Sequence, residues 1–349
     1  MSDRVVLQVG GTKIEKFCSY RIDADLYMAG DSFNLELAPL ALGIKEGSRC
    51  QLLVNDRLEL TGLIDRIEDG GSCDRNWTHL DGRDLMGLVV DSYVEEYVTL
   101  EGITLKALAE RLLKKVPFIN RSAIEYQGGI AGARANTTTG DGTMFGDEQA
   151  KAQVEPGQTV FEVLKDYAMS RGAMFFSLPH GAFVFGRPKA KGRPMFKLTR
   201  RRDGRGNNVL DGSRVRDLSQ RYSKITVIGQ QQGQDQFDTD EINTKAEVTD
   251  GEVPFYKPYV TINNNDGQSP AHEARMLLEQ QRARGVQFSY RVARHSQNGR
   301  NWTINELCEL EDEVLNERAT YLIYGRTFIL DKRDGPTTEL RLGLPGVIQ

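Results

Sequence analysis

The chain has 349 residues, enough for two or three domains that each bury a core of their own. Hydrophobic residues make up 39% and charged residues 27%, which is ordinary for a folded protein, and a net charge of −4 is too small to indicate a general attraction to nucleic acid or membranes. The 35 glycines against 11 prolines indicate many turns, and therefore many strands.

The cysteines and the first residues give no sign of secretion or metal binding. No two of the four cysteines form a C-x-x-C pair, so zinc sites and thioredoxin-like redox sites are not predicted, and buried free thiols in a reducing compartment are expected. The chain enters a strand pattern at once, without a secretory signal, and no apolar run is long enough to cross a bilayer. We therefore expect synthesis and folding in the cytoplasm.

Residues 1–97 are predicted to form an N-terminal β-barrel-like domain. Short runs of alternating polarity indicate strands, and a hairpin tip is expected at Asn55-Asp56-Arg57; the strands are expected near residues 5–9, 19–25, 32–37, 50–54 and 58–64. A further hairpin in this domain ends at Gly82, Arg83 and Asp84, which we interpret as a structural corner without catalytic chemistry. Arg83 and Asp84 are expected to tie strand ends together there.

Residues 98–190 are predicted to form an α+β domain with two capped helices. Gly102-Ile103-Thr104 begins the first helix, which Pro117 stops, and Thr159 with Glu162 forms a capping box at the start of the second. A β-hairpin is expected after Gly172, and the glycine-rich stretch from Gly128 to Asp147 is expected to be a long exposed loop.

Residues 191–284 are predicted to hold basic and acidic loops, a strand and one helix. The stretch Arg187–Arg205 contains nine Lys or Arg residues against one acid, and Gln230–Glu252 is polar and acidic. The helix begins at an N-cap Ser269 followed by Pro270 and ends near Gly285. Residues 285–349 return to β structure, with hairpins expected around Gln297-Asn298-Gly299 and around residues 332–336.

No catalytic, metal-binding or cofactor-binding residues are predicted, and no cofactor is expected. The four histidines are scattered, no G-x-S-x-G elbow exists, and the glycine-rich loop lacks the spacing of a phosphate loop. The one charged feature of note is the basic run of Lys197, Arg200, Arg201, Arg202 and Arg205. It is interpreted as a solvated loop, as a contact with a protein partner or a lumen, or as a nucleic-acid contact.

An ordered set of short motifs indicates a family. It comprises L-x-V-G-G at residues 7–11, T-G-x-I-D at 61–65 leading to Gly82-Arg83-Asp84, G-x-T helix starts at 102 and 157, the hairpin after Gly172, and a late β segment ending in L-x-L-G-L-P. In this order and length the chain resembles the phage Mu-type baseplate hub proteins, a late control or tail protein family of contractile-tailed phages. The resemblance covers nearly the whole chain.

The resemblance implies a structural protein and no enzyme. Its expected fold is α+β and β-rich, with two small β-barrel-like tube domains separated by an α+β domain and long loops. The second barrel would be completed by residues 285–349, with a contribution from Ser223–Gly229. Three copies would form a ring that adapts the sixfold tail tube to the trimeric central spike, as in hubs related to phage T4 and to type VI secretion spikes.

Partners and location also follow from the resemblance. The implied partners are two further copies of the chain, the central spike protein, the tail tube or distal tail protein, and the baseplate wedge proteins, with DNA only in transit through the lumen. The implied location is the virion tail baseplate, assembled in the host cytoplasm. The alternative is a tail-associated cell-wall hydrolase, for which the sequence contains no recognisable hydrolase domain.

Overall fold

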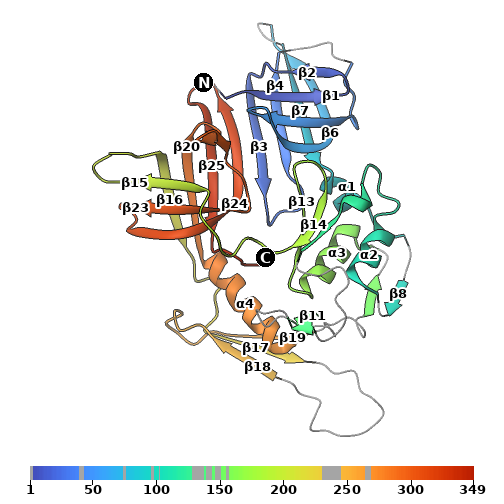
Figure 1. Cartoon of the computed structure of the whole chain (residues 1–349), viewed down its shortest axis with the longest axis vertical. Coiled ribbons are helices and arrows are strands. Elements are labelled where there is room, and N and C mark those ends of the chain that lie inside the picture. The colour runs from blue at the N-terminus through green and yellow to red at the C-terminus, as the bar shows by residue number, and fades with distance from the viewer. Residues whose placement is uncertain are drawn as a thin grey trace.

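The computed structural model describes residues 3–38, 43–73, 76–95, 98–101, 103–127, 137–138, 144–145, 151–154, 157–229, 245–263 and 269–349. In these residues one large sheet of 13 strands dominates a chain with few helices (Figure 1). The prediction of a β-rich α+β fold is therefore confirmed. The described strands do not form the two closed barrels that were expected, because the sheet runs from β16 to β2 without pairing of these end strands, and β23 and β15 branch from it at β24.

The first half of the sheet is formed by the N-terminal strands. These are β1 Val5–Val9, β2 Thr12–Ile14, β3 Ser19–Asp25, β4 Ser32–Leu37, β5 Arg49–Val54, β6 Arg57–Gly71 and β7 Asn76–Asp84. Alternation decides which face is buried: Phe33, Leu35 and Leu37 of β4 all lie in the core. The predicted tip between β5 and β6 is confirmed, since Asn55 and Asp56 both have positive φ, as a tight two-residue hairpin turn requires.

The second half comes from the C-terminal part of the chain and from two earlier strands. Its members are β15 Phe196–Arg200, β16 Val209–Arg216, β20 Val286–Ala293, β23 Glu306–Asp312, β24 Glu317–Asp331 and β25 Gly335–Gly343. The small hairpin of β21 Ser296–Gln297 and β22 Arg300–Asn301 turns at the predicted residues. The prediction of a basic loop is wrong for β15, where Phe196 and Leu198 alternate with polar residues and are buried.

Each half contains the same five-strand unit. In chain order the units are β3, β4, β5, β6, β7 and β16, β20, β23, β24, β25; across the sheet they run β5-β6-β7-β4-β3 and β23-β24-β25-β20-β16. Phe33 faces Gly82, which faces Ile64, and in the second unit Phe288 faces Leu342, which faces Ile323. The register shifts that follow Ile64 and Ile323 therefore coincide when the units are superposed. The same superposition places Cys50 of β5 on Cys308 of β23 and Leu80 of β7 on Leu340 of β25.

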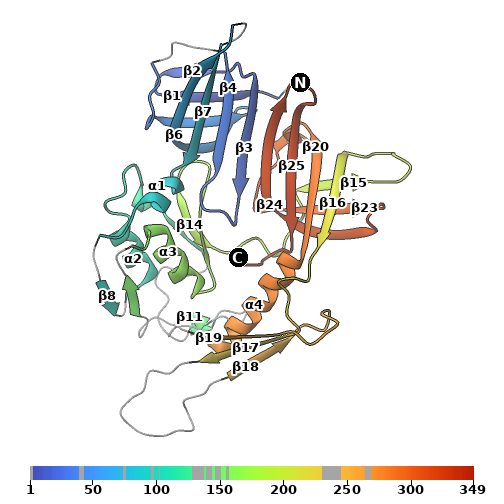
Figure 2. The same ribbon diagram turned by 180° about the vertical axis from the view of Figure 1, so that it is seen from behind.

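The two units meet where β3 pairs antiparallel with β24, and this internal joint is visible from both sides of the molecule (Figures 1 and 2). One hydrophobic core extends under both, from Ile22 and Leu52 in the first unit to Phe288 and Phe328 in the second. Since a single core spans the joint, the two halves are packed together as one body.

The α+β domain follows β7 and packs below the first unit (Figure 1). Its two longer helices have the predicted caps: Thr104 accepts from the backbone N of Ala107 at 3.2 Å, and Thr159 and Glu162 form the capping box. Its elements are α1 Met86–Asp91, β8 Val98–Glu101, α2 Leu105–Leu112, η1 Arg121–Ala123, β9 Glu125–Tyr126, β10 Thr137–Thr138, β11 Met144–Phe145, β12 Lys151–Val154, α3 Val160–Met169, β13 Met174–Ser177 and β14 Phe183–Gly186.

A small third layer is inserted between β16 and β20 of the second unit. It consists of β17 Lys224–Gly229, β18 Lys245–Thr249 and β19 Pro258–Asn263, covered by the predicted helix α4 Pro270–Gly285 with its Ser269 cap. The expectation that Ser223–Gly229 contributes to a second barrel is wrong, because β17 pairs only with β18 and β19 among the described strands. Most of the predicted glycine-rich loop and residues 230–244 of the acidic stretch lie outside the described residues.

Candidate functional site

The corner residues Gly82, Arg83 and Asp84 are the last three of β7, where β6 crosses closely. A Cβ added to Gly82 would lie 2.3 Å from the backbone O of Leu63 and 2.4 Å from the Phe33 ring. Only glycine fits at this distance, since real Cβ contacts are never so short. The segment is thus the end of a strand in close contact with its neighbours, and the tight turn expected at Gly82-Arg83-Asp84 is absent.

Arg83 joins three elements at this corner. Its Nε donates to Asp65 of β6 at 2.7 Å, and its Nη2 donates to Asp91 at the end of α1 at 2.6 Å. The hydrogen bonds to Asp91 and Asp65 raise the pKa of Arg83, and the same contact lowers the pKa of Asp91. All three side chains are partly exposed, so the arrangement holds β7 against α1 without enclosing a reaction site.

The Asp84 side chain is buried, and both of its carboxylate oxygens accept hydrogen bonds. One carboxylate oxygen accepts from the backbone N of Met86 at 3.1 Å, and the other accepts from the Ser177 hydroxyl of β13. Burial raises the pKa of Asp84 to about 6, against the opposing effect of the Ser177 hydrogen bond, and burial together with the charge of Asp84 raises the pKa of Asp31. Asp84 therefore joins the first unit to the α+β domain, with no free oxygen aimed at a cleft.

The raised pKa of Asp84 predicts a pH-dependent stability. Because the folded chain holds this proton more tightly than the unfolded chain, the stabilisation is fully present below the unfolded pKa of about 4 and is lost as pH rises through about 6. Between pH 4 and 7, the free energy of unfolding measured in urea should fall on the order of 2 kcal/mol in the unmodified chain because of this group. Asp84→Asn should abolish that fall. Asp91→Asn, the control at an exposed carboxylate of the same corner, should keep that decrease. An unchanged profile in Asp84→Asn would contradict this prediction.

A shallow polar groove lies beside the corner, and its charges compensate one another. Arg83 pairs with Asp65, and Arg341 pairs with Asp23 at 3.2 Å and with Asp25 at 3.1 Å. A groove of balanced charge gives no field that would collect a ligand of one sign.

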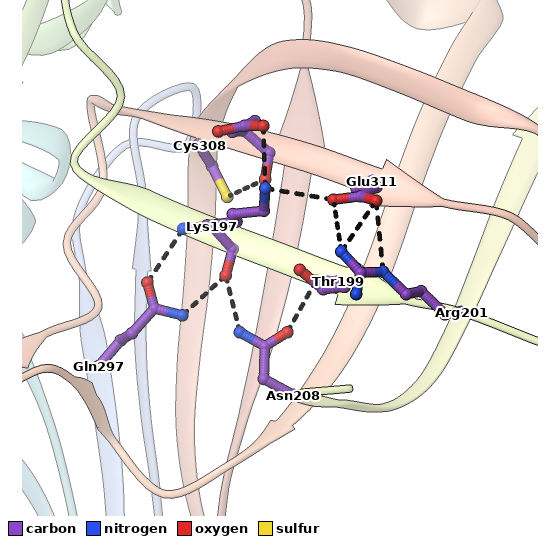
Figure 3. Close-up of polar contacts among 8 residues, drawn as sticks. Lys197, Thr199, Arg201, Asn208, Gln297, Cys308 and Glu311 are labelled. Carbon is purple, nitrogen blue, oxygen red and sulfur yellow. Dashed lines mark hydrogen bonds and ion pairs between the residues drawn. The ribbon is translucent and has the colours of Figure 1, made fainter. Parts of the chain in front are cut away.

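Two residues of the basic run, Lys197 and Arg200, lie on β15, which runs parallel to the acidic strand β23, and the other three follow this strand. Lys197 Nζ lies 3.1 Å from Glu309 and 3.2 Å from Glu311, and Arg201 Nη2 lies 3.2 Å from Glu311 (Figure 3). These pairs raise the pKa of Lys197 and lower that of Glu311. Arg200 donates to Asp312 at 3.5 Å, whose side chain is buried.

The remaining basic residues are placed less tightly. The backbone N of Arg202 donates to Glu313 at 3.0 Å, and that of Arg205 donates to Asp203 at 2.9 Å. Since the acids of β23 neutralise Lys197, Arg200 and Arg201, the basic run presents much less free positive charge than its sequence indicates. This argues against a nucleic-acid contact, which depends on cations available to phosphates.

The outer edge of β15 is closed by side-chain amides. Gln297 accepts from the backbone N of Lys197 at 2.9 Å and donates to its O at 2.7 Å, while Asn208 accepts from the backbone N of Thr199 at 2.8 Å (Figure 3). These bonds satisfy the backbone groups that another strand would otherwise use.

The described part of the chain contains no cluster of metal-binding side chains, since no group of three or more His, Cys, Asp or Glu residues is placed there to hold a metal ion. Burial lowers the pKa of His295 to about 4, and its ring contacts the Tyr20 hydroxyl at 2.7 Å and the Thr338 hydroxyl at 3.1 Å, so it is a packed core residue. No described helix combines the length and the apolar composition that crossing a membrane requires.

The sequence did not reveal the buried ion pair of Glu59 and Arg326. The side chains are 7% and 3% exposed, and they connect β6 of the first unit with β24 of the second. Asn301 donates to Glu59 at 2.6 Å, and Arg326 donates to the Trp302 carbonyl at 3.1 Å. No local pattern could have identified the pair, because its members are separated by most of the chain.

Two protein-family models match parts of this chain. Residues 4–84 match the N-terminal domain of the Mu phage baseplate assembly protein GpP-like family, a match that ends at the Asp84 corner. Residues 221–284 match the third domain of the NMB1110-like tail proteins, which here comprises β17–β19 and α4. Neither model describes an enzyme.

Individual relatives agree with these matches. Baseplate hub protein gp44 of Escherichia phage Mu is 26% identical over 198 residues, covering 54% of this chain and 50% of gp44, so the chain spans about half the length of this curated relative. A tail protein from Neisseria meningitidis MC58 superposes with a TM-score of 0.83 at 24% identity, covering 99% of this chain and 98% of that one. An E. coli type VI secretion component, described as structurally similar to T4 tail proteins gp27 and gp5, gives a TM-score of 0.57 at 10% identity, covering 97% and 76%. The similar structures show that the fold is shared.

Proposed function

Because the chain is a gp44-like, GpP-like tail protein, as its resemblance to the Mu-type hubs indicated, we propose that it is the hub subunit of a contractile-tail baseplate. In this proposal three copies form a ring that adapts the sixfold tail tube to the trimeric central spike. The protein is a structural component of the virion baseplate and catalyses no reaction.

The duplicated five-strand unit is the observation that carries this proposal. Two units with the same strand order and the same register shift lie side by side in each chain. Three chains then supply six similar units, which can match a sixfold tube on one side while the chain as a whole keeps threefold symmetry for the spike. The two half-sheets would complete barrel-like tube domains only within this ring.

The charge distribution fits the proposed partners. The tube or distal tail protein, the spike and the wedge proteins would contact rigid surfaces on the two units. DNA would only pass through the lumen, and the pairing of Lys197 and Arg201 with Glu309 and Glu311 leaves little free cationic charge to hold it.

The proposal predicts a trimer with internal pseudo-symmetry. Light scattering after size exclusion should give three times the mass of the chain, and negative-stain class averages should show a ring with six similar lobes. Dilution should return the ring to single chains without unfolding, which near-UV circular dichroism can follow. A chain that stays monomeric up to the highest soluble concentration and gives no rings would overturn the proposal.

A further inference from the structure

The internal joint shows how one unit accepts the next. The first part of β24, Glu317–Ile323, pairs with β23. After the register shift, residues Gly325–Leu330 leave that partner and pair with β3 of the first unit. The second part of this long strand is therefore the receiving edge for a neighbouring unit.

The equivalent receiving edge in the first unit has no partner among the described strands. The first part of β6, Arg57–Leu63, pairs with β5, and the contact ends where Gly47 donates to the Ile64 carbonyl at 2.7 Å. Beyond the shift, residues Arg66–Gly71 pair with β7 alone in the described part of the chain.

The matching donor edge is β16, the counterpart of β3. It pairs with β20 on one side and with no described strand on the other, where Arg200 donates to the Gly212 carbonyl at 2.8 Å. Leu210 and Val215 on this strand are 55% and 56% exposed. The outer edge of β15 is closed by side-chain amides, whereas the outer edge of β16 has no partner among the described strands and its Gly212 carbonyl accepts a side-chain hydrogen bond, so strand pairing can occur along it.

We propose that β16 of one copy pairs antiparallel with the second part of β6 of the next copy, repeating the internal joint between chains. This inference rests on the proposed ring and specifies its subunit contact. It makes the sheet continuous through all six units, so that each chain gives one edge and receives one, as a closed heterologous ring requires.

The superposed units fix the expected register. At the internal joint Asp25 faces Gly325 and Ile22 faces Phe328. Superposing the units, with Phe33 on Phe288 and Ile64 on Ile323, puts β16 in the place of β3 and β6 in the place of β24. Each pair at the internal joint therefore has an expected counterpart at the contact between copies. The expected pairs are Asp217–Arg66, Arg216–Ile67, Val215–Glu68, Arg214–Asp69, Ser213–Gly70 and Gly212–Gly71.

The charges along this register are complementary. Asp217 and Arg214 of one copy lie opposite Arg66 and Asp69 of the next copy, and no pair places like charges opposite each other. Arg214 also binds Glu317 of its own chain at 3.1 Å, so the pair of Asp217 with Arg66 is the stronger of the two expected contacts. The internal joint supports the first pair, because Asp25 binds Arg341 at 3.1 Å and a Cβ on Gly325 would lie 2.1 Å from that arginine side chain. Between copies Arg66 itself stands at the position of Gly325, where it can meet Asp217. Its side chain is 64% exposed in the single chain.

Disulfide trapping tests the register. The test variant combines Glu68→Cys with Val215→Cys in a chain that also carries Cys18→Ser and Cys73→Ser. After mild oxidation, this variant should give linked dimers and trimers on non-reducing gels. The matched control combines Glu68→Cys with Ser213→Cys, two positions out of register and beyond the reach of a disulfide, and should stay unlinked. Trimers by light scattering without the Glu68–Val215 link would overturn this inference while leaving the proposed ring intact. Absence of trimers in the unmodified chain would overturn both.

A charge exchange gives a second measurement that does not depend on cysteine chemistry. Arg66→Asp and Asp217→Arg should each weaken trimer formation on the order of tenfold or more, because each places like charges opposite each other at three contacts. The double variant should restore assembly. Single variants that assemble like the unmodified chain, or a double variant that stays monomeric, would contradict the register.

Discussion

Replacing Glu59 with glutamine is expected to lower the free energy of unfolding by about 3–5 kcal/mol, the cost of leaving a buried charge without its partner. Arg326, which is 3% exposed, then retains its guanidinium charge between the two units without an anionic partner, because the glutamine amide is neutral and has one acceptor oxygen where the carboxylate has two. Asn301 also loses a carboxylate acceptor at 2.6 Å. Chemical denaturation followed by circular dichroism measures the change.

Two controls separate the buried pair from charge removal in general. Glu15→Gln breaks an exposed pair with Arg4, whose side chains are 43% and 52% exposed, and should change the stability by less than about 1 kcal/mol. Glu59→Leu combined with Arg326→Met removes both charges and should recover most of the loss, because burying an ion pair costs desolvation that an apolar pair avoids. If Glu59→Gln behaves like Glu15→Gln, the pair does not hold the units together.

Local patterns in the sequence predicted the elements well. The caps at Thr104, Thr159 and Ser269 each depend on a side chain bonding a backbone N a few residues away, so the signal is contained in one short segment. The same holds for the hairpin tips at Asn55 and Asn298, where positive φ favours asparagine.

The arrangement of the elements could not be predicted in the same way. β15 was hidden within a run of basic residues because its cations are matched by acids of β23, more than a hundred positions later in the chain. The duplication was also hidden: Cys50-Gln-Leu and Cys308-Glu-Leu are equivalent in space, but few other residues agree between the units. What the units share is strand order and a register shift, and neither can be read from residue identity alone.

The expectation of two separate barrels failed for a related reason. Alternation along each strand indicates which face is buried, but it does not indicate which strand comes next to an edge. Here β3 pairs with β24 of the other unit, so the sheet continues where a barrel would have closed. In our proposal the sheet closes only when copies assemble into a ring. The contacts that close it are those between the edge of β16 in one copy and the edge of β6 in the next.

Gly82→Val is expected to destabilise the chain by at least about 3 kcal/mol and to reduce its soluble yield sharply, because overpacking here involves backbone as well as side chains. The new Cβ would lie 2.3 Å from the Leu63 carbonyl, and it could be accommodated only by separating β7 from β6. Since β7 is central to the first unit, the Glu59 side of the internal joint would shift as well. Soluble yield, thermal unfolding and light scattering measure these effects.

Gly11→Val is the matched control for this change. Nothing lies within 4 Å of a Cβ added at Gly11, and its φ is not in the left-handed region, so the same substitution should be tolerated with a change of less than about 1 kcal/mol. Gly82→Ala should fall between the two, because it adds the clashing Cβ without the branched methyl groups. Trimers of normal stability in Gly82→Val would show that β6 and β7 can separate at this corner, and that the close approach is not required for the unit to fold.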